Sequence, residues 1–384
     1  MSSDFSKAES REPSQDRASW LTVVTVSLMF HAALMGLYLA AFHGDWSAFV
    51  CVDKERLGTP PFEHIGVGFP LKGFDGQSYY AIARDPWRFQ SAEVMHAPCY
   101  WHSRLLYPVL AWSLSAGGQP AILIVVLPLI NLACIGVLTW LGCRLALHFQ
   151  RSAWWGLLLA VSLNPGMAAL RDLTDPLSTM ACVGLLVAFL LNDSPIWIVF
   201  WGAAAVFSRE QNLVLLALLA CRHVLDRRPG AAACCVLAGL PWFIWVLFLH
   251  WGYGAWPFVG ENLAWPLQGM LFRWSNLAHP GGRVAGMVHA AGMSLLTLEV
   301  VLAIMMLSLR AGFVAGGLAL FGAFLVVFGG ESIYFNGWSY NRVFVFLPMG
   351  IGVWAMQTNR AWPLYLTGGA AMWPILAVAQ AWLR

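Results

Sequence analysis

The sequence predicts an all-α integral membrane protein, and two features of its composition carry this prediction. Of the 384 residues, 59% are hydrophobic and 11% are charged, and the mean hydropathy is +0.66, whereas soluble domains carry about 25% charged residues. The apolar residues also form long runs with almost no charge. Such a chain has too little polar surface to cover a water-soluble globule, which excludes a soluble enzyme, a disordered chain and a fibrous protein.

About eleven apolar segments are candidates for spanning helices, because crossing an apolar layer about 30 Å thick takes roughly 20 residues. Backbone groups find no water in that layer, so each crossing segment is expected to be helical. The first segment, 20–42, is too long for the core of a signal peptide and follows a polar tail, 1–18. The others are 119–143, 152–170, 176–192, 194–208, 211–221, 229–260, 288–309, 311–330, 343–359 and 361–383.

Basic residues divide the loops between the two sides of the membrane. With residues 1–18 in the cytoplasm, the loops on that side hold arginines and few acids, as the positive-inside rule requires. These arginines are Arg144, Arg151, Arg222, Arg227, Arg228, Arg310 and Arg360. The opposite side then receives a long first loop, 43–103, and a second large loop, 251–287. Residues 19–384 are therefore expected to form a single polytopic membrane domain.

Some short apolar segments are not expected to cross the membrane alone. Segment 104–118 contains a proline and is expected to form an interfacial helix on the outer leaflet, with a second amphipathic helix at 75–88 on the same surface. Segments 194–208 and 211–221 are expected to form a hairpin. Its tip, Ser208 to Glu210, would end inside the protein.

Acidic residues in the outer loops are the first candidates for chemistry, because an ionisable group at membrane depth is by default a functional hypothesis. Asp75 opens the segment DGQSYYAIA, in which Tyr79 and Tyr80 offer rings suited to a sugar or a lipid headgroup. Asp172 and Asp175 lie about one helical turn apart in RDLTDP. Burial at the edge of the membrane raises the pKa of a carboxyl group, which suits a general base.

Arginines are expected on the same outer side as these acids. Arg104, Arg209 and Arg342 fall in outer loops or at their edges, and Glu210 follows Arg209. A guanidinium group binds two phosphate oxygens at once. Transfer of a group from a phosphate-linked lipid carrier needs a base for the acceptor's proton and positive charge for the departing phosphate. The predicted residues supply both.

These residues also carry a resemblance to a known family. A long first outer loop with DGQSYYAIA followed by RLLYPVLAW, and a second acid in RDLTDP, resembles the GT-C superfamily of membrane glycosyltransferases, including bacterial proteins of cell-surface glycopolymer synthesis. The resemblance implies a polyprenyl-phosphate sugar donor, a glycan, lipid or protein acceptor, and inverting transfer on the extracytoplasmic side. It matches Asp75 to the base, Asp175 or Asp172 to the second acid, and Arg342 to a donor-phosphate contact.

One departure from the family bears on cofactors. Many relatives have two adjacent acids in the first loop, whereas Gly76 follows Asp75 here. No His, Cys, Asp or Glu spacing indicates a metal site either, so a divalent metal is not supported by the sequence.

The net charge of +3 and the absence of a basic run give no reason to expect a nucleic-acid partner. The short loops, and a first loop without glycosylation sequons, favour a bacterial inner membrane.

Each candidate residue also has a structural alternative. Asp75, followed by a glycine, could cap a loop, and Asp172 or Asp175 could cap the helix that follows. Arg209 and Glu210 could form a buried ion pair with each other, and Arg342 could extend to headgroups or pair with Glu331. Cys51 and Cys99 share the first loop and could form a disulfide.

Two other classes of function are also compatible with the sequence. A lipid or glycan transporter, or a flippase, would need polar residues spaced along its spans, whereas the polar groups here gather on one side. A non-catalytic assembly subunit could keep the fold without the chemistry. Neutralising Asp75 separates an enzyme from both.

Overall fold

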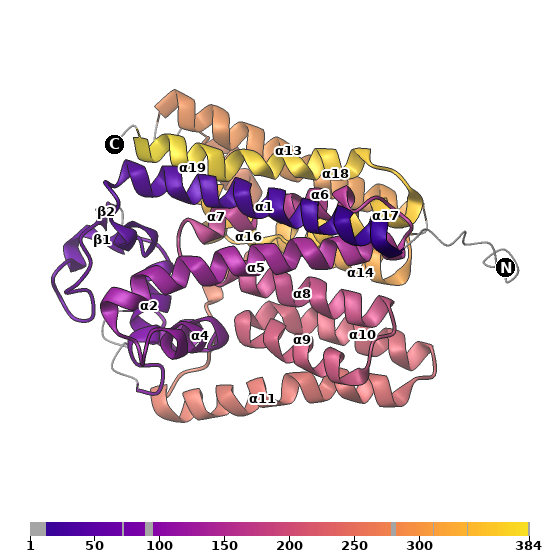
Figure 1. Ribbon diagram of the computed structural model, residues 1–384, viewed down its shortest axis with the longest axis horizontal. Coiled ribbons are helices and arrows are strands. Elements are labelled where there is room, and N and C mark those ends of the chain that lie inside the picture. Colours follow the sequence, from indigo (N-terminus) through magenta and orange to yellow (C-terminus); the bar gives the residue numbers. More distant parts are fainter. Residues whose placement is uncertain are drawn as a thin grey trace, which may run out of the picture.

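The computed structural model describes residues 13–70, 73–88, 95–277, 282–309, 311–335 and 337–382, and its regular structure is almost entirely helical. The long helices run side by side in a bundle (Figure 1). The first helix begins at one end of this bundle, and the short elements of the first loop lie together at the other end. The prediction of an all-α protein is confirmed.

The first third of the chain consists of two long helices joined by a loop of short elements. Its two strands pair in parallel, with Val52 opposite Gly68 and Asp53 opposite Phe69, and α2 packs against α4. The elements are α1 (Pro13–Ala41), η1 (Trp46–Phe49), β1 (Val52–Asp53), η2 (Lys54–Arg56), β2 (Gly68–Phe69), α2 (Gly76–Arg84), α3 (Pro98–His102), α4 (Leu106–Leu114) and α5 (Pro120–His148).

The rest of the chain alternates long helices with short ones. In order these are α6 (Trp154–Ser162), α7 (Pro165–Ala169), α8 (Asp175–Leu190), α9 (Pro195–Ser208), η4 (Glu210–Asn212), α10 (Leu213–Leu225), α11 (Pro229–Tyr253), η5 (Gly260–Asn262), α12 (Gln268–Ser275), α13 (Gly282–Ser308), α14 (Phe313–Phe328), α15 (Glu331–Tyr334), α16 (Gly337–Val343), α17 (Phe346–Thr358), α18 (Trp362–Thr367), η6 (Gly368–Ala371) and α19 (Met372–Trp382).

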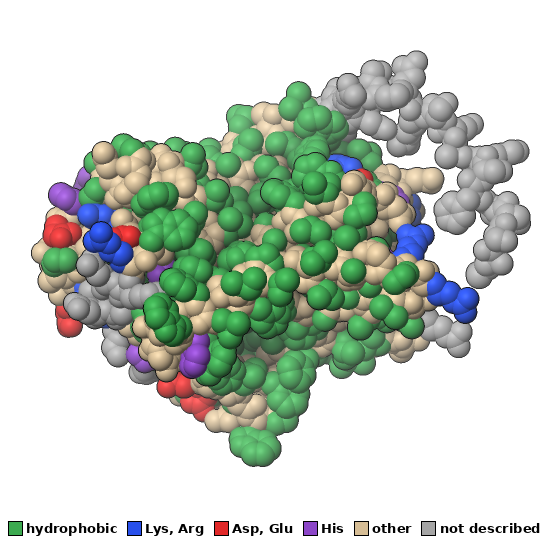
Figure 2. Space-filling view, turned by 90° about the horizontal axis from the view of Figure 1, so that it is seen from below, with side chains coloured by type: hydrophobic (Ala, Val, Ile, Leu, Met, Phe, Trp, Pro, Cys, Tyr) green, Lys and Arg blue, Asp and Glu red, His purple; other side chains and the backbone are tan. Residues whose placement is uncertain are grey.

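Within the described residues, five helical segments are long and apolar enough to cross a membrane. They are Trp20–Ala41, Pro120–His148, Pro229–Tyr253, Gly286–Ser308 and Trp362–Trp382. Helices α8, α9 and α14 are apolar but shorter. In Figure 2 hydrophobic side chains cover most of the visible face between its two ends, where the charged groups gather. The prediction of membrane-spanning helices is thus supported, whereas the predicted number of about eleven exceeds these five.

Segment 152–170 does not form the single helix that its hydropathy predicts. It is divided into α6 and α7, which are separated at Leu163 and Asn164. Asn164 has a positive φ of 50°, and Pro165 disfavours the α conformation in the residue before it. The apolar composition of the segment gives no sign of this break.

The predicted hairpin of short helices is α9 followed by α10. Ser208 and Arg209 at its tip are buried, as expected for a tip that ends inside the protein. Helix α9 packs mainly against α8 and α11, and α10 packs mainly against α11, so the two helices contact each other little. The long helix α11 therefore supports the segment that carries Arg209 and Glu210.

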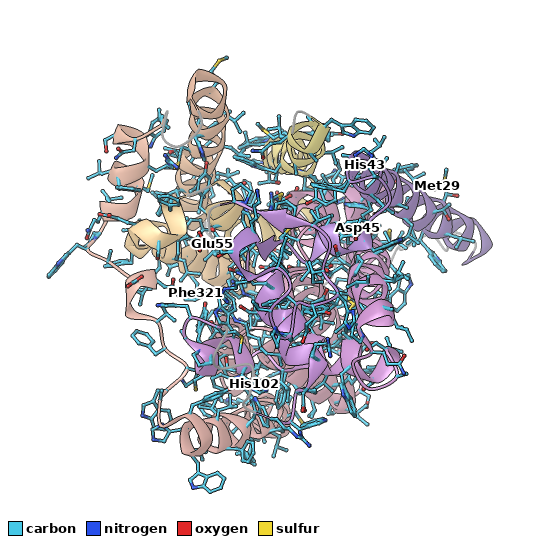
Figure 3. All side chains as sticks on the ribbon, turned by 90° about the vertical axis from the view of Figure 1, so that its left-hand side faces the viewer. Met29, His43, Asp45, Glu55, His102 and Phe321 are labelled. Atoms are coloured by element: carbon cyan, nitrogen blue, oxygen red, sulfur yellow. The ribbon has the colours of Figure 1, made fainter. Side chains whose placement is uncertain are left out.

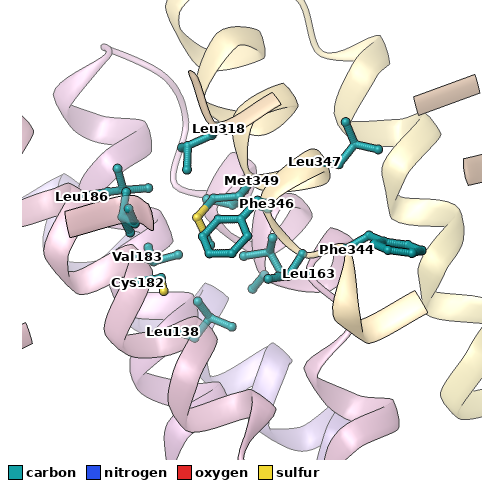
Figure 4. Packing of buried hydrophobic residues seen from close by; sticks show 14 of the residues in the cluster. Leu138, Leu163, Cys182, Val183, Leu186, Leu318, Phe344, Phe346, Leu347 and Met349 are labelled. Carbon is teal, nitrogen blue, oxygen red and sulfur yellow. The ribbon is translucent and has the colours of Figure 1, made fainter. Parts of the chain in front are cut away.

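The core lies around α8 and α17, two short helices that are buried on all sides, as a uniformly apolar helix should be. Cys182, Val183 and Leu186 of α8 meet Phe346 and Met349 of α17 (Figure 4).

Helices α14 and α17 approach closely at glycines. A Cβ atom at Gly322 would lie 2.4 Å from the backbone nitrogen of Leu347, and one at Gly350 would lie 2.6 Å from that of Ala319. Small residues of this kind let helix backbones pack together without a side chain between them. Helices α15 and α16 lie between the two packed helices in the chain.

Cys51 and Cys99 do not form the disulfide that the first loop made conceivable. Both are free thiols. The Cys51 thiol donates to the carbonyl of Ala48 at 3.3 Å, and the Cys99 thiol donates to the carbonyl of Ala255 at 3.1 Å.

Candidate functional site

Six of the predicted charged residues meet at the end of the bundle that holds the first loop. They are called the charge cluster here: Asp75, Arg104, Asp175, Arg209, Glu210 and Arg342. They come from the start of α2, the α3–α4 junction, the start of α8, the α9–α10 junction and α16. Figure 3 looks onto this end of the molecule, where Asp45, Glu55 and His102 are labelled.

Arg342 joins the two aspartates of the charge cluster. Its Nη2–H donates to Oδ2 of Asp75, and its Nη1–H donates to Oδ2 of Asp175 at 3.2 Å. The other oxygen of Asp175 accepts from Nη1 of Arg209 at 2.5 Å. Asp175 is buried and bridges two guanidinium groups, whereas the Asp75 side chain is 23% exposed. Asp75 is thus the more accessible of the two carboxylates.

Arg104 and Glu210 form the second half of the charge cluster. Nε and Nη2 of Arg104 donate to the two oxygens of Glu210 at 2.9 and 2.7 Å, which is a bidentate pair. Arg104 also donates to the hydroxyl groups of Tyr79 and Tyr100. Its guanidinium lies 4.2 Å from the centre of the Tyr100 ring. The buried Arg104 is therefore held in one orientation by three neighbours.

Gly76 explains how Asp75 comes within reach of the loop before α8. A Cβ atom at position 76 would lie 2.3 Å from the carbonyl oxygen of Arg171 and 2.8 Å from that of Val50. Only a residue without a side chain lets the first turn of α2 pack there. The glycine that replaces a second acid is therefore required by packing.

The charge cluster balances three arginines against three carboxylates. Desolvation alone would raise the pKa of Glu210, but the Arg104 guanidinium holds that pKa below its usual value. Burying such charges is favourable only if each is paired and hydrogen-bonded. The described contacts pair all six.

A cavity of about 460 Å³ opens onto the charge cluster. Five members of the cluster line it, and Asp175 lies behind them against the arginines. Aromatic side chains form much of the remaining wall, in particular Tyr100, Trp101 and Phe258. This site cavity offers anion-binding groups, one partly exposed carboxylate and apolar surface within a single space.

A larger cavity, of about 920 Å³, adjoins the site cavity. The two share Leu263 and Ser332. Its lining includes Glu261, Glu331 and Trp265, whose side chain is 82% exposed. We call it the tryptophan cavity.

Three further predicted site residues do not line the site cavity. Asp172 is fully buried, does not line the site cavity, and hydrogen-bonds to no described residue; burial raises its pKa well above the usual value. It has a positive φ of 47° and precedes α8, so it does not share a helical face with Asp175. Tyr79 and Tyr80 are also fully buried, Tyr80 against Phe62, so neither presents its ring to a ligand.

The structural alternatives for the clustered residues are not observed. Asp75 and Asp175 lie at helix starts, but no side-chain capping bond forms at either helix. Arg209 pairs with Asp175 and not with its neighbour Glu210. Glu331 accepts from Gln268 at 3.1 Å, while Arg342 turns to the aspartates.

The sequence reasoning missed Tyr100 and His102. Tyr100 precedes Arg104 by four residues, a spacing that brings side chains together on a helix and could have indicated the contact. His102 holds the first loop in place: its two ring nitrogens contact the carbonyl of Pro86 at 2.9 Å and the hydroxyl of Tyr253 at 2.8 Å. Burial lowers the pKa of His102 to about 4.

The donor set does not fit a metal ion. In the part of the chain that the structure describes, no three His, Cys, Asp or Glu side chains are arranged to hold one. The carboxylates of the charge cluster are bound by arginines instead.

Comparison with known proteins gives no family model, no curated protein and no solved structure that matches the chain.

Proposed function

We propose that the chain is a membrane glycosyltransferase that moves a sugar from a polyprenyl-phosphate carrier to a glycan, lipid or protein acceptor. In this proposal about eleven helical segments cross or enter a bacterial inner membrane, and the first loop faces the extracytoplasmic side. The observation that carries the proposal is the charge cluster on the site cavity, where arginines from three distant segments adjoin an accessible carboxylate.

The arginines are suited to the donor's phosphate. A balanced cluster accepts one further negative charge more readily than an acidic one. We infer that the phosphate of the donor displaces Asp75 from Arg342 and that Arg104 and Arg209 complete the positive surface. The apolar wall of the site cavity adjoins this surface and suits a prenyl chain.

Displacement from Arg342 would free Asp75 to act as the base. Asp75 takes the proton of the acceptor hydroxyl, and the hydroxyl oxygen bonds to the anomeric carbon of the sugar. The bond from that carbon to the phosphate oxygen breaks, and the carrier phosphate leaves with the bonding electrons. Attack opposite the leaving group inverts the anomeric centre, and the arginines stabilise the departing charge.

Asp175 has a positioning role in this scheme. It touches Arg209 and Arg342 but does not line the site cavity. It therefore orients the phosphate-binding groups rather than the acceptor. In this scheme the second acid of the resemblance is Asp175, which acts on the arginines and does not reach the acceptor.

The tryptophan cavity is suited to the acceptor. An exposed indole ring stacks on the apolar face of a sugar, and carboxylates and amides accept and donate hydrogen bonds to its hydroxyl groups. Trp265, Glu261 and Gln268 supply these groups beside the site cavity. A glycan-bearing acceptor thus fits this cavity best.

The proposal is tested by incubating the purified protein with a panel of labelled polyprenyl-phosphate sugars and measuring loss of label from the carrier. We expect turnover of at least one donor, and we expect Asp75→Asn to reduce it by about 10²- to 10⁴-fold, the usual contribution of a general base. Absence of turnover with every donor, with and without added acceptor, would refute the proposal.

A matched control comes from the same loop. Asp85 pairs with Arg88 on the surface and does not line the site cavity. We expect Asp85→Asn to leave turnover unchanged. If Asp75→Asn also leaves it unchanged, the carboxylate is not the base, and a transporter or a non-catalytic subunit becomes the better account.

A further inference from the structure

A third cavity, of about 420 Å³, lies at the opposite end of the bundle from the charge cluster. The ends of α8 and α10 line it, together with the start of α14 and the end of α17. Those helices have their other ends near the site cavity. Since α8 has 16 residues, the two cavities are separated by about 24 Å of helix.

Positive charge dominates this basic cavity. Arg222 and Arg228 line it, and Asp226 is the single acid in its lining. Asp226 is paired with Arg222 at 2.9 Å, and Arg228 donates to the side-chain oxygen of Asn192 at 2.6 Å. Two arginines against one aspartate leave an excess positive charge, in contrast to the balanced charge cluster.

The start of α14 adds donors to the same space. Gly312, Phe313 and Val314 line the cavity, and the first turn begins with the bond from the Gly316 amide to the Gly312 carbonyl at 2.8 Å. The amides before Gly316 have no acceptor within the helix, so they carry the partial positive charge of a helix N-terminus. Such amides bind anions, phosphate in particular.

His223 is an independent sign of a ligand. Its side chain lines the cavity and is 4% exposed, yet neither ring nitrogen hydrogen-bonds to any described group. A buried polar group without a partner is unfavourable, because it loses its hydrogen bonds to water and gains none in return. A bound anion would give the imidazole an acceptor.

Exposed apolar side chains accompany the basic cavity. Phe313 lines it and is 40% exposed beside the Arg222 guanidinium, and Val224 and Leu225, which follow His223 in the sequence, are more than half exposed. Exposed apolar side chains next to arginines suit a ligand that has an anionic head and acyl chains. We propose that the basic cavity binds the phosphate group of an anionic phospholipid, on the face opposite the charge cluster.

The test measures lipid binding to the purified full-length protein by native mass spectrometry and by thermal unfolding in detergent. Three additions are compared: phosphatidylglycerol, phosphatidylcholine with the same acyl chains, and inorganic phosphate. We expect phosphatidylglycerol to bind at least about tenfold more tightly than phosphatidylcholine and to raise the unfolding temperature, because hydrogen bonds to a charged group are stronger than those between neutral groups. Equal binding of the two lipids, or equally tight binding of inorganic phosphate, would overturn the proposal.

Variants locate the bound lipid. Arg228 is exposed and contributes no core packing, so Arg228→Gln should fold and lose about tenfold in affinity for phosphatidylglycerol. Arg360 belongs to the same cytoplasmic group of arginines in the predicted topology but does not line the cavity, so Arg360→Gln should bind as the wild type does. Equal losses in the two variants would mean that the lipid senses general surface charge, and the cavity assignment would be wrong.

Discussion

The two ends of the molecule use the same charged residue types in different ways. At the charge cluster, three arginines and three carboxylates from distant segments are paired with one another. At the basic cavity, arginines from the α10–α11 junction exceed the acids, and a buried histidine has no described partner. In Figure 2 acidic, histidine and basic side chains lie together at one end of the surface, and mostly basic ones lie at the other.

The difference in charge balance indicates what each end can bind. A site with an excess of positive charge can hold an anion permanently, since Arg228 donates there to the neutral amide of Asn192 and not to a carboxylate. A balanced site releases a carboxylate each time an anion enters. The first arrangement suits a resident lipid, and the second suits a reaction in which the released carboxylate takes part.

The largest expected effect on stability concerns the buried pairs. Asp175→Asn would leave Arg209 and Arg342 without the carboxylate that bridges them, and breaking a buried pair destabilises by about 3–5 kcal/mol. The surface pair of Arg144 and Asp193, at 3.6 Å, is the matched control. Asp193→Asn should change stability by less than about 1 kcal/mol.

The measurement for this prediction is the free energy of unfolding of the purified variants in detergent. Equal values for Asp175→Asn and Asp193→Asn would show that the charge cluster is as weakly coupled as a surface pair. The contrast between the two ends would then lose its energetic basis.

A smaller effect is expected from the buried His102. His102 is neutral in the folded protein because burial lowers its pKa to about 4, against 6.5 for the free side chain. Between these values the unfolded chain binds a proton that the folded one does not, so stability falls as pH decreases from 6.5 to 4. The shift corresponds to a loss on the order of 3 kcal/mol.

The contribution of His102 to the pH dependence is measured by comparing the wild type with a variant that lacks this histidine. His102→Gln removes this titration, so its free energy of unfolding should fall less than that of the wild type over the same pH range. His223→Gln leaves His102 in place and should therefore keep the His102 contribution to the slope. Identical slopes for the wild type and His102→Gln would contradict the role given to His102 in holding the first loop.

The sequence predicts the class of fold and the types of residue at the site. It does not predict which of these residues contact one another. Hydropathy and charge are local properties, so they predict the apolar helices and the outer placement of Asp75, Arg104 and Arg342. The pairing of Arg104 with Glu210 joins residues 106 positions apart, and it depends on how α3 and the α9–α10 tip meet. No local pattern specifies that meeting.

Two predictions about site residues are wrong, one because of backbone conformation and one because of helix packing. The spacing of Asp172 and Asp175 predicts a shared face only if both are helical, and Asp172 lies before α8 with a positive φ. Tyr79 and Tyr80 were expected to face a ligand because aromatic rings suit sugars. Helix α2 instead packs against α4 and α5 and buries both.

The most direct test of the account compares donor binding with donor turnover in Asp75→Asn. If the donor phosphate displaces Asp75 from Arg342, removing that carboxylate's charge should leave the dissociation constant of the turned-over donor unchanged or lower, while turnover is lost. Asp85→Asn should alter neither quantity. A parallel loss of binding and turnover in Asp75→Asn would show that this residue supports the site rather than reacting in it, and the central claim would be contradicted.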